Sequence, residues 1–362
     1  MPDYSTFERP SAIEKLRAEI RGIPYRPAKR KKQTPQQPDP MAIRNLFTVY
    51  TGNRWMELGD REPEAKMLFG EFWYQHELCF LFANTNTGKS ILAVQIGNAI
   101  ARGAKTGPFP CTAPAAKVLY ADFELSTSQF HKRYNKPGET DITPFNDNFL
   151  RAQFNTANLL EANTGDMVDD ELLLTSLEYR IQQLQATVLI IDNISCLGAG
   201  TGNAAGALRL MQRLNAMRVE HKLSILVLAH TPKRRNPSLP LSVGDLLGSK
   251  LLMNFADSAF TIGISNTDNS LRYIKQIKQR SNHQVYGDDN VCLGRIQKHR
   301  NFLQFRFDGN SPESQHLLTA AQARKQQLAE KVLQLSAEGH SQRQISEQLG
   351  IGLGTVNRLL KG

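Results

Sequence analysis

The polar loop at residues 84–90 carries the residue types and the spacing that bind a phosphate group. It follows the mostly apolar segment 78–82 and precedes segment 91–100, where apolar residues recur at helical spacing. A loop that joins a strand to a helix directs backbone N–H groups and the positive end of the helix dipole toward an anion. We therefore expect a phosphate-binding loop formed by Asn84, Thr85, Asn86, Thr87, Gly88, Lys89 and Ser90.

Two side chains of this loop have predicted roles. Lys89 is expected to reach the β- and γ-phosphates of a nucleotide, and the hydroxyl of Ser90 is expected to bind Mg²⁺. The first position of such loops is usually glycine, and Ala83 is compatible with it only if its φ stays negative. A chance Gly-Lys-Ser on a surface turn is the alternative, and the segments on both sides of the loop count against it.

Asp192 closes the apolar segment 187–192. A carboxylate at the end of such a strand can hold Mg²⁺ through water, and this is its predicted role. The alternative is an aspartate that caps the following loop.

Glu124 and His230 also stand at the ends of apolar segments. We expect Glu124 to be the general base that orients and deprotonates the attacking water. Asp122 competes for that role, and Glu124 is the favoured candidate of the two. His230 is expected to hydrogen-bond the γ-phosphate or its water, with a purely structural histidine as the alternative.

Alternating apolar strands and amphipathic helices must position these groups. The pattern predicts an α/β fold with a mainly parallel sheet covered on both faces, in which ligands bind at the carboxyl ends of the strands. An aromatic-rich segment, 68–74, is expected to pack in the core, with the floor of a nucleotide pocket as the alternative. The expected strands are 78–82, 117–124, 187–192, 223–229, 257–264 and 272–279, with a hairpin of 291–296 and 302–307, and the expected helices are 91–100, 175–184 and 204–221.

Four motifs in this order resemble those of the RecA-like ATPases, and most closely those of the RepA-type plasmid replication helicases. The DnaB-type replicative helicases are more distantly similar. The motifs are Ala-x4-Gly-Lys-Ser, Tyr-Ala-Asp-Phe-Glu-Leu-Ser, Leu-Ile-Ile-Asp-Asn and Leu-Ala-His-Thr. The resemblance covers roughly residues 45–310 and implies a RecA-like P-loop NTPase core that uses ATP and Mg²⁺ and acts on DNA. These relatives also accept alanine at the position of Ala83.

Lys278 and Arg280 match a Lys-x-Arg pair that RecA-like hexamers carry on a late strand. The resemblance implies that both reach the ATP of a neighbouring subunit and stabilise charge on the transferring phosphoryl group. Self-association into a ring or filament would then be required. The alternative is a basic edge strand that discourages aggregation.

Two regions are predicted to bind DNA. Lys233, Arg234 and Arg235 lie in a basic, proline-rich loop that would grip single-stranded DNA in a channel, with a solvated mobile loop as the alternative. Residues 340–361 resemble the helix-turn-helix of resolvases and transcription factors, preceded by a helix at 322–339. Ser341 is expected to cap the second helix of this tail. Thr355, Asn357 and Arg358 would face the major groove of duplex DNA, and a three-helix protein-contact module is the alternative.

Composition agrees with three regions: a flexible basic arm at 1–40, a RecA-like ATPase domain at 41–312 and a small all-α helix-turn-helix domain at 320–362. The net charge is +10, and both ends are basic, with nine Lys and Arg against five Asp and Glu in 1–40 and six against three in 320–362. The four cysteines show no zinc-ligand spacing, and no apolar run is long enough to span a membrane. We expect a cytoplasmic protein with no structural metal and no membrane partner.

These features predict an ATP-driven RecA-fold motor of a plasmid or other mobile element, which translocates on or unwinds DNA during replication or mobilisation. A second hypothesis is an ATP-switched DNA-binding regulator or loader without unwinding activity. A third is an ATPase that only scaffolds partner proteins.

Overall fold

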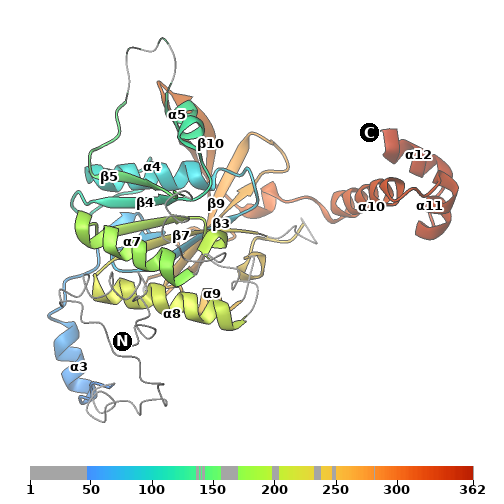
Figure 1. Ribbon diagram of the computed structural model, residues 1–362. Coiled ribbons are helices and arrows are strands. Elements are labelled where there is room, and N and C mark those ends of the chain that lie inside the picture. Colours follow the sequence, from blue (N-terminus) through green and yellow to red (C-terminus); the bar gives the residue numbers. More distant parts are fainter. Residues whose placement is uncertain are drawn as a thin grey trace, which may run out of the picture. The chain divides into compact units, whose positions relative to one another are not determined.

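A computed structural model describes residues 47–135, 138, 140, 143–155, 170–197, 204–231, 238–246, 250–280 and 282–361 (Figure 1). The predicted basic arm at 1–40 lies outside these residues, and so do Lys233, Arg234 and Arg235. By its internal contacts the chain forms two compact units. The first unit is Met1–Leu78, Ile96–Ser126 and Phe145–Leu226, and the second is Cys79–Gln95, Thr127–Pro144 and Val227–Gly362.

Within the described residues, nine strands form one mainly parallel sheet, which confirms the predicted fold class. Their order is β11-β10-β9-β8-β3-β7-β6-β4-β5. The strands are β3 (Leu78–Ala83), β4 (Val118–Asp122), β5 (Phe149–Gln153), β6 (Val188–Asp192), β7 (Ser224–His230), β8 (Ser258–Ile264), β9 (Leu271–Gln279), β10 (Val291–His299) and β11 (Phe302–Ser311). A separate antiparallel pair consists of β1 (Met67–Phe69) and β2 (Trp73–Tyr74).

The described helices are α3 (Gly52–Gly59), α4 (Lys89–Arg102), α5 (Thr127–Tyr134), α7 (Asp170–Leu184), α8 (Ala204–Glu220), α9 (Lys250–Phe255), α10 (Ala320–Ala337), α11 (Gln342–Leu349) and α12 (Leu353–Lys361). Six of the described helices, α4, α7, α8, α10, α11 and α12, overlap predicted segments, whereas α3, α5 and α9 were not predicted. Short 3₁₀ turns occur at Ile194–Leu197, Val243–Asp245 and Glu313–His316. Among the helices that the structure describes, none is long and apolar enough to span a membrane.

In the first unit, β4 lies between β5 and β6 and is parallel to both. Every residue of β4 and β6 is buried, as expected for strands covered on both faces. The register pairs Asp122 with Asp192, so the two strands end side by side. Residues that follow these strands therefore emerge at one edge of the sheet, and they include Glu124 and Asn193.

In the second unit, β3 and β8 are parallel, and β9, β10 and β11 extend the sheet from β8 as an antiparallel meander. The predicted hairpin is present, and its strands are longer than the apolar segments that predicted them. The division between the two units passes through α4 and β7, so the phosphate loop and His230 belong to the second unit.

The aromatic segment at 68–74 packs in the core of the first unit. Phe69 stacks on Phe72, with ring centroids 5.1 Å apart, and the rings of both also contact Phe109 edge-on. Gly70 has φ of 47° and approaches Phe109 so closely that a Cβ would lie 3.1 Å from its side chain. These contacts agree with the expected core packing.

The C-terminal tail is a bundle of α10, α11 and α12 around a small core of Val332, Ile345 and Val356. Ser341 caps α11, as predicted, by accepting a hydrogen bond from the backbone N–H of Gln344 at 3.4 Å. Gly350, with φ of 62°, ends α11 in the left-handed conformation and turns the chain toward α12. The two helices and the turn are those predicted, whereas the division into an arm, an ATPase domain and a DNA-binding domain stays a prediction.

Candidate nucleotide-binding site

The phosphate loop begins where β3 ends. Ala83 is the buried last residue of β3 and is not among the described residues with positive φ, so alanine fits this position without strain. Its carbonyl accepts a hydrogen bond from the backbone N–H of Thr231 at 3.1 Å. This bond connects the start of the loop to the residue that follows His230.

Two residues with positive φ shape the loop, Asn86 at 61° and Gly88 at 106°. Alternation of such residues with ordinary ones turns successive N–H groups toward one side and forms an anion-binding concavity. Thr87 stabilises the turn because its hydroxyl donates to the carbonyl of Asn84 at 2.9 Å. Gly88 also packs so tightly that a Cβ would lie 2.5 Å from Cδ1 of Ile296.

Lys89 opens α4 and is almost fully buried. Its ammonium group donates to the carbonyl of Ala83 at 2.9 Å and to that of Asn84 at 3.0 Å. Its Nζ also lies 3.3 Å from Nδ1 of His230. The structure therefore brings together Lys89 and His230, as the sequence analysis expected for a site at the strand ends. The neighbouring side chains of Asn84, Thr85 and Asn86 are exposed and accessible to a ligand.

In the first unit, Asp192 is the buried end of β6. The hydroxyl of Tyr120, itself fully buried in β4, donates to Oδ2 of Asp192 at 2.5 Å. This bond fixes the direction of the carboxylate. The sequence analysis gave Tyr120 no role, because its partner is on another strand and 72 positions away.

Asp122 and Glu124 have different environments. Asp122 is buried, and its carboxylate accepts bonds from the backbone N–H groups of Glu124 and Leu125 and from Nε of Arg151 at 2.8 Å. Glu124 is exposed and accepts a hydrogen bond from the side-chain amide of Asn193. Asp122 is thus occupied in holding the turn after β4, which leaves Glu124 as the candidate base.

The carboxylates at this edge create a negative field. Burial raises the pKa of the Cys196 thiol, and the charges of Glu124 and Asp192 raise it further. Such a field attracts a divalent cation. Within the second unit, the loop offers N–H groups and an ammonium, which are donors that suit phosphate groups. Within the first unit, the carboxylates offer oxygen ligands that suit a divalent cation.

A sequence model of the AAA domain matches residues 51–236, slightly more than half of the chain. This chain belongs to the AAA domain family. The match contains Lys89, Glu124, Asp192 and His230, and it supports the ATPase activity of a P-loop fold. Membership also implies binding of a nucleotide, usually with Mg²⁺. No curated protein matches the chain.

Lys278 and Arg280 lie beyond the matched AAA domain, at the end of β9. Lys278 pairs with Ala259 at the start of β8, whereas Ala83, where the phosphate loop begins, pairs with Ile262 near its end. The three residues from Ala259 to Ile262 span about 10 Å along the strand. The structure therefore does not bring this pair to the Lys89 of the same chain.

At their own end of the sheet, both cations have local partners. The ammonium of Lys278 donates to the carbonyl of Met253 at 2.7 Å, and Arg280 forms an ion pair with Asp257 at 3.1 Å. Burial lowers the pKa of Lys278, and the charge of Arg280 lowers it further. The side chain of Arg280 is 56% exposed, so most of it is accessible to another molecule.

The predicted DNA-reading residues of the tail lie on α12. Val356 is buried in the small core, Thr355 and Asn357 beside it are half-buried, and Arg358 is exposed. The arrangement leaves polar groups of α12 on the surface of the bundle. Lys233, Arg234 and Arg235 lie outside the described residues, so their role stays a prediction.

Proposed function

We propose that this AAA-domain chain is an ATP-hydrolysing RecA-fold motor that acts on DNA as an oligomeric helicase or translocase. Replication or mobilisation of a plasmid or other mobile element is the process that we infer. The observation that carries the proposal is the location of Lys278 and Arg280 at the opposite end of β8 and β9 from the phosphate loop. A pair at that location can serve the nucleotide of a neighbouring subunit but not that of its own chain.

In the proposed reaction, backbone N–H groups of the loop and the ammonium of Lys89 hold the phosphates. Ser90 and Asp192 hold Mg²⁺, which neutralises the charge that develops on the phosphates. Glu124 orients the attacking water and accepts its proton, while Asn193 positions the carboxylate of Glu124.

His230 contacts Lys89 and leads directly into Thr231, which is bonded to Ala83. His230 is therefore suited to report the state of the γ-phosphate to the loop that follows. Arg280 and Lys278 of the neighbour supply positive charge to the transferring group.

DNA binding is proposed for two regions of different kinds. The tail, with α12 after the Gly350 turn, supports contact with duplex DNA through Thr355, Asn357 and Arg358. The basic loop with Lys233, Arg234 and Arg235 is proposed to grip a single strand.

Steady-state ATP hydrolysis without DNA, with single-stranded DNA and with duplex DNA tests the proposal. A motor that grips one strand will hydrolyse ATP faster when single strands are added, and it will unwind a tailed duplex. The variant Arg358→Ala should weaken duplex binding and leave stimulation by single strands intact. Hydrolysis that ignores single strands would contradict the motor.

The alternative is an ATP-switched DNA-binding regulator or loader, for which the three-helix tail would equally supply the contact with duplex DNA. In that case nucleotide controls assembly on a duplex site and no strand separation occurs. Duplex binding that depends on ATP, together with unstimulated hydrolysis and no unwinding, would support this alternative over the motor.

A further inference from the structure

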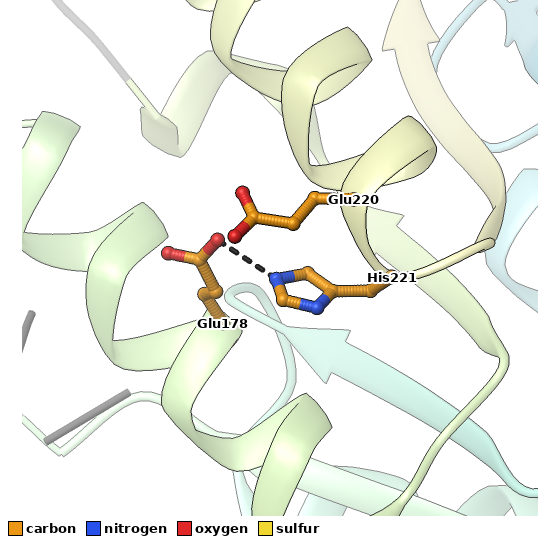
Figure 2. Close-up of side chains that lie close together, drawn as sticks. All are labelled: Glu178, Glu220 and His221. Atoms are coloured by element: carbon orange, nitrogen blue, oxygen red, sulfur yellow. Dashed lines mark hydrogen bonds and ion pairs between the residues drawn. The ribbon is translucent and has the colours of Figure 1, made fainter. Parts of the chain in front are cut away.

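Three side chains with metal-ligand chemistry meet between α7 and α8 of the first unit (Figure 2). Glu178 comes from α7, Glu220 is the last residue of α8, and His221 follows it. One ligand atom of each lies within 4.8 Å of those of the other two. Nε2 of His221 lies 2.9 Å from Oε1 of Glu178, and in Figure 2 the carboxylate of Glu220 points toward the same place.

The other oxygen of Glu178 is already fixed. Arg213 of α8 donates to both oxygens of this carboxylate, with its shorter contact to Oε2, and its Nε donates to Glu171 at 3.1 Å. Partners of this kind orient a ligating carboxylate. They hold Glu178 so that Oε1 faces His221 and Glu220.

The charge balance of the cluster is negative. Glu171, Glu178 and Glu220 bring three carboxylates, whereas Arg213 is the guanidinium that pairs with two of them. Glu178 keeps its charge although it is buried, because the bonds from Arg213 and His221 outweigh the effect of burial and lower its pKa.

Glu220 is not explained by this ion-pair network. Within the described part of the chain its carboxylate has no hydrogen-bond or ion-pair partner, and yet it lies beside another carboxylate. Two carboxylates at such a separation repel each other unless a cation lies between them. A hydrogen bond from His221 to Glu178 accounts for two of the three groups and leaves the third unexplained.

We propose that Oε1 of Glu178, a carboxylate oxygen of Glu220 and Nε2 of His221 bind one divalent transition-metal ion of the Zn²⁺ class. Imidazole together with carboxylates suits such an ion, while Mg²⁺ and Ca²⁺ prefer oxygen ligands throughout. Three protein ligands leave a position for solvent. His221 binds as neutral imidazole, and any proton on Nε2 is released to solvent when the metal binds.

The ion would fasten α7, which precedes β6, to α8, which follows it. Its role is structural and separate from the nucleotide chemistry, because its ligands are distinct from Ser90 and Asp192. The site therefore has its own test, whose failure would leave the proposed motor function standing.

The test is a titration of the full-length chain, without a polyhistidine tag and freed of metals by a chelator. Zn²⁺ is added in the presence of excess Mg²⁺ and ADP, which saturate the nucleotide site. Calorimetry gives the stoichiometry and affinity, and Co²⁺ gives a visible absorption band that reports nitrogen and oxygen ligands. We expect one ion per chain and a melting temperature that rises and saturates with metal.

Glu220→Gln and His221→Gln should each weaken Zn²⁺ binding by at least about tenfold and remove the rise in melting temperature. His340→Gln, at an exposed histidine of the tail, is the matched control and should bind as the unaltered chain does. Glu220 is exposed, so its substitution tests the site with the fold intact. Absence of Zn²⁺ binding to the unaltered chain, or equal binding by both cluster variants, would overturn the proposal and show that any bound ion is adventitious.

Discussion

Lys89 contacts both the start of the phosphate loop and His230, so it connects these two parts of the site. Its ammonium bonds the two carbonyls at the start of the phosphate loop and also lies beside His230. A nucleotide would offer phosphate oxygens as stronger partners for the same group. Binding therefore exchanges neutral acceptors for charged ones and alters the surroundings of His230.

Lys89→Ala should reduce ATP turnover by at least about 100-fold, because preorganised charge stabilisation of the phosphoryl group is lost. Steady-state phosphate release measures this effect. Lys105→Ala, at an exposed lysine after α4, serves as the control and should keep normal turnover. Normal turnover in the Lys89 variant would mean that residues 84–90 do not form the nucleotide site.

Tyr120→Phe removes one oxygen atom and with it the hydrogen bond that the hydroxyl donates to Oδ2 of the buried Asp192. Loss of a hydrogen bond to a charged group costs about 1.5–3 kcal/mol of stability. The carboxylate also becomes less well oriented, so the Mg²⁺ concentration needed for half-maximal ATP hydrolysis should rise. Urea unfolding and a Mg²⁺ titration of hydrolysis measure the two effects. A loss of stability with an unchanged Mg²⁺ requirement would give Tyr120 a packing role only.

At the scale of elements, the contact between α7 and α8 is polar and depends on pH. Burial alone would raise the pKa of Glu178, but the bonds from Arg213 and His221 lower it below its ordinary value of 4.5. The charged carboxylate therefore stabilises the fold above that value. Its contribution is lost as the pH falls toward the lowered folded-state pKa, because the unfolded chain takes up the proton first.

Glu178→Gln should reduce the loss of unfolding free energy that accompanies acidification. Urea unfolding of metal-free protein between pH 6 and about 3 measures it. Glu338→Gln, at an exposed residue that ends α10, is the matched control and should retain the full acid dependence. If the unfolding free energy of the Glu178 variant falls with pH as that of the unaltered chain does, the network does not control the acid dependence of stability.

The elements with strong local signals were predictable from sequence. The continuous apolar runs of β3, β4, β6 and β7 and the pattern Asn84–Ser90 need no long-range information, and their strand ends carry the groups of the site. The sequence analysis did not predict β5, because Arg151 and Gln153 interrupt its short apolar pattern. That strand forms because β4 lies beside it.

Contacts between distant residues were not predictable for the same physical reason. Tyr120 with Asp192 and Glu178 with His221 are brought together by the packing of whole strands and helices, and no sequence spacing indicates either pair. The expectation of no structural metal came from cysteine and histidine spacing and did not consider the cluster of Glu178, Glu220 and His221, for which metal binding stays a proposal. The sequence thus predicted the strand ends of the site but not the residues that orient them.

At the scale of the whole molecule, the location of Lys278 and Arg280 predicts an active site shared between chains. Arg280→Ala should cut turnover sharply and leave nucleotide binding nearly intact. A mixture of Arg280→Ala chains and Lys89→Ala chains gives a stricter test. The first kind of chain keeps Lys89 and the second keeps Arg280, so each supplies the residue that the other lacks. An equal mixture of the two should regain activity at about a quarter of its interfaces if subunits assemble at random.

Phosphate release and binding of a fluorescent nucleotide analogue measure both outcomes. A mixture as inactive as its components, from chains that are shown to co-assemble, would place Arg280 outside the reaction. Loss of nucleotide binding together with turnover in Arg280→Ala would mean a structural role for its pair with Asp257.

The closeness of Gly88 to the hairpin of β10 and β11 has a consequence for how this protein can evolve. A Cβ at Gly88 would meet not only Ile296 but also the ring of Phe305, at 2.9 Å. Those two side chains form a wall behind the phosphate loop, although they lie outside the segment that matches the AAA domain. A larger residue at position 296 would displace the phosphate loop, as a larger residue at position 88 would. Substitutions at these two hairpin positions should therefore be tolerated only where nucleotide binding is retained. Residues of the hairpin and of the phosphate loop should then change together in evolution.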